Sequence, residues 1–333
     1  MSFERDTTER LHDMLRRGDD FFLFRAPGAR AQFLNLGEVS FSLWPGESPR
    51  SDVWSGSTDR ADYLERVGVL TGQLRRRGGK TVISRTVAGT ALRTDLVQLV
   101  SDFFDTYPQA YRTFFIDHRY GGWLGASPEL LFSIDRGRLH TMALAGTRAA
   151  DLTGPWDDKN ICEHMMVADF IDSCLDACGT SHIRSERGEL QYGSISHLLT
   201  RFESTVPGDL GRFKALMFPT PAVGGLPRGR ALADIAAIEQ HPRQLYAGLI
   251  DLTDPADGRR YCIVNLRCMH FNITGPADPA ALSGKYNLQY CIYAGGGITG
   301  DSDPAAEWDE TEQKSRRLRD CIAANQTHYG LNC

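Results

Sequence analysis

Strand-like segments follow one another along this sequence in groups, and helical segments separate the groups. The segments that favour strands are bounded by Gly, Pro, Asp or Asn; they cover residues 20–25, 32–42, 80–88, 113–117, 129–135, 259–271 and 286–294. The segments that favour helices repeat apolar residues at intervals of three and four; they cover residues 59–76, 93–107, 158–178, 208–217, 229–241 and 303–321. This order predicts an α+β fold of large, mainly antiparallel sheets with helices packed outside.

The chain has 333 residues, of which 41% are apolar, and this is enough to bury a large core without disulfides or metals. No Pro/Gly-rich stretch is long enough to act as a linker, and no internal repeat is visible. We therefore predict a single domain over residues 1–333.

Charge and composition exclude several classes of protein. The net charge is −5 and no block of five like charges occurs, so we expect neither nucleic acid nor a membrane surface as a partner. No apolar run reaches the ~20 residues that span a bilayer, and the first residues are charged, so we expect a cytoplasmic protein. The eight cysteines are interpreted as reduced thiols; Cys174 and Cys178, four apart on a helix, favour packing over metal binding.

The last helical segment carries three charged residues on one face. Asp303-Pro304 is a good helix start, and Glu307, Glu310 and Lys314 then follow at spacings of three and four. Alone, such a triad is typical of a solvated ladder of ion pairs. The preceding segment, YAGGGI, changes this interpretation, because three glycines let a small anion approach the backbone amides.

A second helical segment places Glu163 and His164 in its first turns. A Glu there is commonly a response to the helix dipole, and a lone His is more often a hydrogen-bonded core residue than a metal ligand. Glu163 and Glu310, on two separate helices, would together suit a hard cation such as Mg²⁺.

Two further charged residues stand beside apolar runs. Lys80 opens KTVISR, and Glu129 follows Ser127-Pro128 in GASPELL. Each alone is typical of the boundary of a structural element. If both lie in one pocket, a desolvated Lys can serve as a base, whereas a Glu in apolar surroundings can keep its proton and serve as an acid.

These segments together resemble the chorismate-utilising family: isochorismate synthases, salicylate synthases, and the large subunits of anthranilate and aminodeoxychorismate synthases. Ten motifs match in order between about Lys80 and Lys314: KTVISR, GASPELL, LAGTR, DKNICEHMMV, SISHLLT, FPTPAVGGLPR, RQLYAG, VNLR, YAGGGI and EWDETEQK. Residues 80–322 are thus the motif-bearing core, and the region 1–79 is short for the family.

The resemblance implies a role for each matching residue. Glu163 and Glu310 would coordinate Mg²⁺, with Glu307 close by, while Lys80 would be the base that activates water and Glu129 the acid that protonates the departing hydroxyl. The residues implied to bind chorismate are the backbone amides of Gly146 and Thr147 at the ring carboxylate, His197 at the ring, and Tyr246, Arg267, Gly297 and Lys314 at the enolpyruvyl carboxylate. Chorismate is a dianion, so cationic groups in excess suit it.

Ala222 indicates the branch of the family. It lies where ammonia-using members normally have Thr, so the resemblance implies that water is the nucleophile and that no protein partner is obligatory. We expect an isochorismate synthase of menaquinone or siderophore biosynthesis, and three alternatives follow: a salicylate synthase, an ammonia-using enzyme, and a catalytically silent chorismate-binding regulator.

The sequence departs from the family pattern at three places. Phe218 stands where many relatives have His, Asp251 stands where Gly is usual, and residues 268–285 resemble an insertion. None of these departures removes a residue to which the resemblance assigns chemistry.

Overall fold

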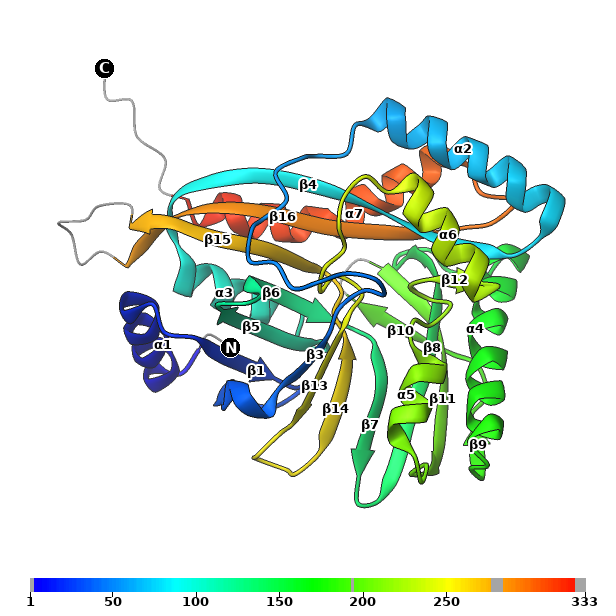
Figure 1. Ribbon diagram of the computed structural model, residues 1–333, viewed down its shortest axis with the longest axis horizontal. Helices are drawn as coiled ribbons and strands as arrows, with labels where there is room; N and C mark the ends of the chain where they lie inside the picture. Colours follow the sequence, from blue (N-terminus) through cyan, green and yellow to red (C-terminus); the bar gives the residue numbers. More distant parts are fainter. Residues whose placement is uncertain (1–2, 193–194, 277–283, 327–333) are drawn as a thin grey trace.

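The computed structural model describes residues 3–192, 195–276 and 284–326. The α-helices in this part of the chain are α1 (Arg5–Arg17), α2 (Arg60–Arg77), α3 (Leu96–Thr106), α4 (Asp158–Ala177), α5 (Leu210–Met217), α6 (Arg228–Ile238) and α7 (Pro304–Ala324), with one 3₁₀ turn at Leu36–Glu38. They surround two large antiparallel sheets (Figure 1).

The first sheet has the strand order β12-β4-β16-β15-β6-β5-β1-β2. Its strands are β12 (Gly225–Leu226), β4 (Lys80–Asp95), β16 (Lys285–Ile298), β15 (Cys268–Pro276), β6 (Gly121–Ser127), β5 (Tyr111–Asp117), β1 (Phe21–Arg25) and β2 (Gln32–Leu34). The long pair β4 and β16 aligns Gly297 with Val82 and Ile298 with Thr81. This register brings the glycine segment beside the start of β4, where Lys80 lies.

The second sheet has the strand order β10-β11-β8-β7-β14-β13-β3, and β9 also pairs with β11. Its strands are β10 (Gly188–Tyr192), β11 (Ile195–Thr205), β8 (Arg138–Ala149), β7 (Leu130–Asp135), β14 (Arg260–Val264), β13 (Leu249–Thr253), β3 (Ser40–Ser42) and β9 (His182–Arg184). β8 and β11 pair with His197 opposite Thr147, so two residues implied to bind substrate are cross-strand neighbours.

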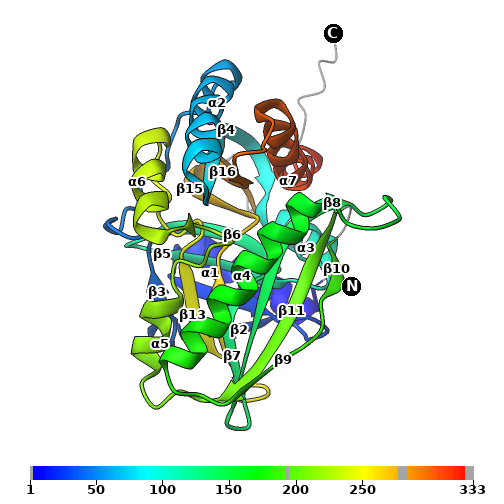
Figure 2. The same ribbon diagram turned by 90° about the vertical axis from the view of Figure 1, so that its right-hand side faces the viewer.

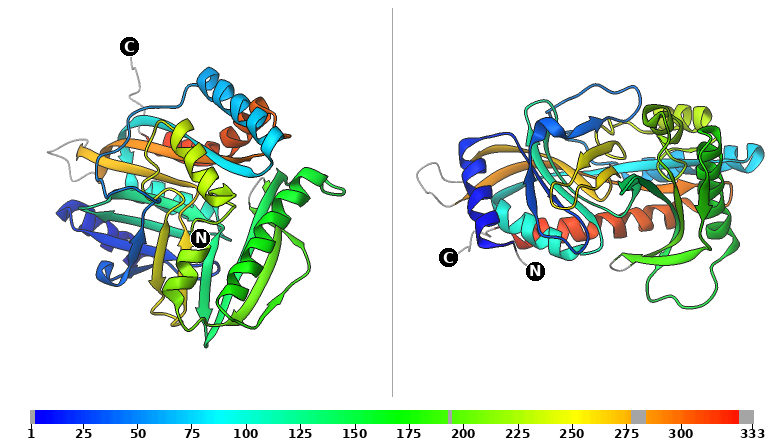
Figure 3. Two further views of the ribbon diagram at one scale, coloured as in Figure 1. Left: turned by 45° about the vertical axis from the view of Figure 1, so that its right-hand side comes forward. Right: turned by 90° about the horizontal axis from the view of Figure 1, so that it is seen from below.

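The helices lie on the outer faces of the sheets. α7 contacts β16 and α2, and α6 contacts β4, while α4 lies along β8 and β11 (Figures 2 and 3). Buried Arg85 of β4 fixes α7: its Nε donates to Thr311 Oγ1 at 2.6 Å, and its guanidinium stacks 4.1 Å from the ring centroid of Trp308. No helix in the described part of the chain is long and apolar enough to cross a membrane.

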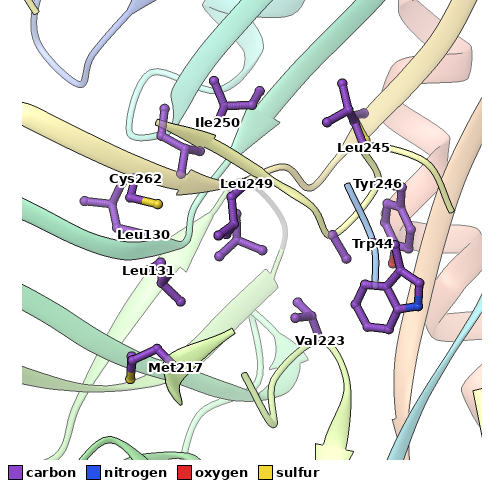
Figure 4. Close-up of a cluster of buried hydrophobic side chains, with 14 of the residues drawn as sticks. Trp44, Leu130, Leu131, Met217, Val223, Leu245, Tyr246, Leu249, Ile250 and Cys262 are labelled. Atoms are coloured by element: carbon purple, nitrogen blue, oxygen red, sulfur yellow. The ribbon is translucent and has the colours of Figure 1, made fainter. Parts of the chain in front are cut away.

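Two buried clusters of apolar side chains form the core. The larger one joins both sheets and includes Phe22, Ile83, Leu131 and Ile250 (Figure 4 shows part of it). The smaller one packs α1, α3 and the end of α7 against the other face of the first sheet. Because β-strands alternate their side chains between faces, β5 contributes Phe114 to one cluster and Phe115 to the other.

The structure confirms the predicted α+β class with antiparallel sheets and outer helices. Two predicted strands were wrong in extent. The segment 32–42 is β2, a 3₁₀ turn and β3, which belong to different sheets, and the segment 259–271 is divided between β14 and β15. The second division occurs where Arg267 adopts a positive φ of 49°, which ends one strand before the next begins.

Other elements were missed or misplaced. The segment 93–107 begins as the end of β4, and only Leu96–Thr106 is helical. The charged N-terminus folds as α1, which buries Leu11 and Leu15. Within the segment that resembles an insertion, Cys268–Pro276 forms β15, an inner strand between β16 and β6, and residues 277–283 lie outside the described residues. β6 and β8 to β13 were not predicted.

Candidate active site

A cavity lies where the glycine-rich end of β16 meets β4, β8, β11, α4 and α7. All thirteen residues that the sequence singled out line it: Lys80, Glu129, Gly146, Thr147, Glu163, His197, Ala222, Tyr246, Arg267, Gly297, Glu307, Glu310 and Lys314. These residues come from across more than 230 positions of the chain, so the fold brings together what the sequence keeps apart.

One wall of the cavity is formed by Lys80 and Glu163 against the backbone of Gly297. Lys80 Nζ and Glu163 Oε1 are 2.7 Å apart, and the Lys80 side chain is almost fully buried. A Cβ at Gly297 would lie 2.6 Å from Glu163 Oε1 and 2.6 Å from Lys80 Cε. Glycine is therefore required here because both charged side chains cross the strand at this point.

The first turns of α7 supply two more carboxylates. Asp303 caps the helix through the amide of Ala306, and Glu307 and Glu310 then face the cavity. Glu307 Oε1 accepts from Lys159 Nζ at 2.9 Å, and Glu310 Oε1 accepts from Lys314 Nζ at 2.5 Å. Glu163, Glu307 and Glu310 are thus each bonded to a lysine.

The two α7 carboxylates influence each other. Burial and the negative charge of Glu310 raise the pKa of Glu307, and the bond to Lys159 opposes this effect. Burial also favours the neutral form of Glu310, but the ion pair with Lys314 outweighs it and lowers the pKa of Glu310. A cation near both carboxylates would relieve their repulsion.

Glu129 lies apart from these ion pairs. Ser127 Oγ accepts from the Glu129 amide at 3.2 Å, and Thr220 Oγ1 donates to Glu129 Oε1 at 3.3 Å. Burial raises the pKa of Glu129 to about 7, although Thr220 and the charge of Lys80 work against the shift. Glu129 is therefore a carboxylic acid that holds a proton near neutral pH, as a general acid must.

His197 is held in its neutral form. Its Nδ1 lies 3.0 Å from the carbonyl oxygen of Gly146, which makes Nδ1 the protonated nitrogen and leaves the Nε2 lone pair toward Arg267, whose Nη2 is 3.5 Å away. Burial and the charge of Arg267 lower the pKa of His197 to about 3. His197 can thus accept a hydrogen bond at Nε2 in the cavity without adding a charge.

The hydrogen-bond partner of the Thr147 amide differs from the expectation. The amide donates to Asn160 Oδ1 at 2.9 Å, so in this structure it is not directed at a substrate. Asn160 in turn donates to Asp157, the N-cap of α4, which ties the β8 backbone to the start of that helix. A substrate carboxylate that binds this amide must replace the Asn160 oxygen.

The remaining polar residues surround the glycine segment. Tyr246 is buried, and a Cβ at Gly295 would lie 2.6 Å from its hydroxyl oxygen. Lys314 Nζ donates to the Gly295 carbonyl at 2.8 Å as well as to Glu310. Arg267 and Lys314 therefore offer cationic groups in the same cavity as Gly297.

The residues present fit a hard divalent cation in number and type. Glu163, Glu307 and Glu310 offer carboxylate oxygens, which Mg²⁺ prefers. A Cβ at Gly296 would lie 3.1 Å from Glu307 Oε2 and 4.0 Å from Glu310 Oε1, so the backbone of Gly296 lies beside these two carboxylates. The three glutamates do not bring one oxygen each within 4.8 Å of one another; in the described chain, Asp20, Asp117 and His118 alone form such a group. Cation binding therefore requires the glutamates to exchange lysine partners for the ion.

Lys159 and Asn160 are among the lining residues that were not predicted as site residues. Both belong to the first turn of α4 inside the matched motif DKNICEHMMV, and this motif was the available signal. His164 is a hydrogen-bonded core residue, as expected: its Nε2 lies 2.8 Å from Thr200 Oγ1. Cys174 and Cys178 are free thiols, and no disulfide occurs among the described residues.

Comparison with known proteins finds the family that the motifs of this chain resemble. The family of chorismate binding enzymes matches residues 39–320. The putative isochorismate synthase MenF of Mycobacterium tuberculosis is 30% identical over 315 residues, which cover 85% of this chain and 79% of that protein. Anthranilate synthase component 1 of Haloferax volcanii is 28% identical over 75% of this chain; the chain spans about half the length of that relative, 48%.

Solved structures of related proteins have the same fold. The menaquinone-specific isochorismate synthase MenF of Escherichia coli superposes with a TM-score of 0.65 and 25% identity over 85% of this chain and 64% of that one. A putative 2,3-dihydroxybenzoate-specific isochorismate synthase, DhbC of Bacillus anthracis, gives a TM-score of 0.68 at 20% identity over 96% and 89% of the chains. The match over residues 39–320 and the relative that is 30% identical across most of both chains show that this chain belongs to the family of chorismate binding enzymes.

Proposed function

We propose that this protein is a Mg²⁺-dependent isochorismate synthase. The observation that carries the proposal is Glu129, a buried carboxyl group that stays protonated near neutral pH in the same cavity as the buried amine of Lys80. An acid and a base in one water-excluding site suit a displacement in which water enters and hydroxide departs.

Arg267 and Lys314 would bind the dianionic substrate. Both cations line the cavity beside the glycine segment, whose small residues let a carboxylate approach the backbone. Neutral His197 adds a hydrogen bond at the ring without adding a charge. Chorismate would thus be oriented by groups on both sheets.

The reaction itself balances without a further reactant. Lys80 accepts a proton as the oxygen of water bonds to C2 of the ring, the ring double bond shifts, and the bond between C4 and its oxygen breaks. Glu129 gives its proton to the departing hydroxyl, which leaves as water, so the product is an isomer of chorismate.

Glu163, Glu307 and Glu310 are the residues that would hold Mg²⁺. When bound, the ion supplies charge stabilisation at the ring carboxylate as electron density moves toward it. In this structure Glu163 instead bonds Lys80. If Glu163 bound the ion in place of Lys80, the Lys80 amine would be able to act as the base.

The choice of water as the nucleophile rests on Ala222, which lines the cavity where ammonia-using members have Thr. The relative named a putative isochorismate synthase, together with the menaquinone-specific neighbour, supports this choice and a role in menaquinone biosynthesis. The use of ammonia is the second candidate, because anthranilate synthases are also among the relatives. Water addition requires no ammonia-supplying protein partner.

The test is to incubate the protein with chorismate, with and without Mg²⁺ and ammonium, and to identify products by chromatography and mass. A Mg²⁺-dependent product of unchanged mass, chromatographically identical to isochorismate, supports the proposal. Salicylate with pyruvate would assign the protein to the salicylate synthases, an aminated ring product would assign it to the ammonia-using branch, and unchanged chorismate would indicate a silent binding protein.

Ala222→Thr tests the interpretation of that position. With ammonium supplied, the variant should divert part of the product toward aminated ring compounds, because the hydroxyl gives the cavity a new hydrogen-bonding group at this wall. An unchanged product ratio in a folded variant would contradict the assignment of Ala222.

A further inference from the structure

Lys159 differs from the other two lysines that bond the cavity glutamates. The Lys80 and Lys314 side chains are 1% and 13% exposed, whereas that of Lys159 is 36% exposed. Lys314 is anchored a second time by the Gly295 carbonyl. The hydrogen bond found for the Lys159 ammonium in the described chain is the one to Glu307, so this lysine is the one that can leave its partner for solvent.

The bond between Lys159 and Glu307 is nevertheless a strong one. Glu307 is buried, its Oε1 also accepts from Ser302, and Glu310 lies nearby. Burial disfavours the charged ammonium, but the carboxylates of Glu307, Glu163 and Glu310 outweigh this and raise the pKa of Lys159. The ammonium therefore neutralises the same carboxylates that we assign to Mg²⁺.

The net charge of the cavity links the binding of the cation to the binding of the dianion. Three lysines and Arg267 face three ionised glutamates, while Glu129 is protonated, so the cavity carries one excess positive charge. Adding Mg²⁺ alone would raise this excess to three positive charges, and adding a dianion alone would leave one negative charge. Adding both returns the cavity to its initial charge. The partly exposed ammonium of Lys159 can leave Glu307 for a carboxylate of the substrate. The cavity can therefore pass from the state in which lysines pair with its glutamates to the state that holds the cation and the dianion.

We propose that Lys159 is a built-in, displaceable counter-ion that competes with the divalent cation for Glu307 and couples cation binding to binding of the dianionic substrate. This inference rests on the proposed metal site and adds a residue to which that function assigns no part. Coupling of this kind is reciprocal, so the substrate must strengthen cation binding by the same factor by which the cation strengthens substrate binding.

The first measurement is calorimetric titration of the substrate-free protein with Mg²⁺. Lys159→Met removes the competitor, so it should bind Mg²⁺ about tenfold more tightly than the natural chain, a ratio that corresponds to one charge-assisted hydrogen bond. Lys159→Arg keeps the charge and should bind as the natural chain does. Lys214→Met is the matched control, because Lys214 pairs with Asp251 away from the cavity.

The second measurement repeats the titration with chorismate present, in a Glu129→Gln background that does not consume it. With Lys159 in place, chorismate should tighten Mg²⁺ binding by about tenfold, and in Lys159→Met most of this gain should be lost. Thermal unfolding of each variant shows that the fold is retained.

The outcomes separate the two proposals. If the natural chain binds Mg²⁺ and Lys159→Met binds it equally or more weakly, the role of Lys159 is refuted while the metal site stands. An undiminished effect of chorismate in Lys159→Met would refute the coupling. If neither chain binds Mg²⁺, both the metal site and the role of Lys159 are wrong.

Discussion

Replacing Glu129 with Gln should make the protein more stable at alkaline pH while it abolishes turnover. Burial raises the pKa of this carboxyl group from the ordinary value of 4.5 to about 7. A shift of about 2.5 units corresponds to about 3 kcal/mol, because each unit is worth 1.36 kcal/mol. Gln has nearly the same shape, keeps an oxygen for the Thr220 hydroxyl, and never ionises.

The sign of the pH effect on stability depends on whether the folded or the unfolded state binds the Glu129 proton more tightly. The folded state holds the Glu129 proton up to about pH 7, whereas the unfolded state releases it near 4.5. The stability that this proton contributes is thus fully present below pH 4.5 and is lost as the pH rises through 7. Relative to the natural chain, Glu129→Gln should gain about 3 kcal/mol over this interval and then remain level.

Urea unfolding of both proteins between pH 4.5 and 9 measures this difference, and contributions from other groups cancel in the comparison. The exposed Glu38→Gln is the control for the same change of residue away from the cavity. In the natural chain, kcat/KM should also fall above pH 7 as the acid loses its proton. A stability difference for Glu129→Gln that is constant over the whole range would refute the assignment of a buried, protonated Glu129.

Three further results are expected. Lys80→Ala should abolish turnover with an unchanged circular dichroism spectrum, and retained turnover would remove Lys80 from the role of base. Millimolar Mg²⁺ should raise the melting temperature of the natural chain by about 2–4 °C if it exceeds the Kd about a hundredfold, and Glu310→Gln should lose this shift; calorimetry that detects no difference between the two would contradict the metal site. Gly297→Ala should abolish activity and cost about 1–3 kcal/mol in urea unfolding, because the added Cβ meets Glu163 and Lys80 at 2.6 Å.

The parts of the fold that the sequence predicts well are those with strong local signals. α7 begins at Pro304 after an Asp cap and has the predicted face of Glu307, Glu310 and Lys314 in the cavity. β4 begins at Lys80, as predicted from the apolar run that follows it. Capping chemistry and periodicity act within a few residues, so they can be recognised without knowledge of the fold.

Sheet membership depends on distant partners and is not visible locally. Residues 259–271 were predicted as one strand, yet β14 pairs with β7 in one sheet and β15 with β6 in the other. The turn between them requires a positive φ at Arg267, and a non-glycine residue gives no sign of this in the sequence. The same holds for β2 and β3, which lie close in sequence and belong to opposite sheets.

The ion pairs of the site also depend on partners that are distant in the sequence. Motifs indicated Lys80, Lys314 and the glutamates of the cavity, but neither Lys159 nor which lysine bonds which glutamate, because the pairs join residues as far apart as Lys159 and Glu307. Pairing determines the chemistry: Lys80 is bonded to Glu163, whereas Glu129, with Thr220 as its hydrogen-bonding partner, remains an acid. A site that must admit a cation and a dianion together can remain folded beforehand only if its charges satisfy one another, and the three lysine–glutamate bonds do this.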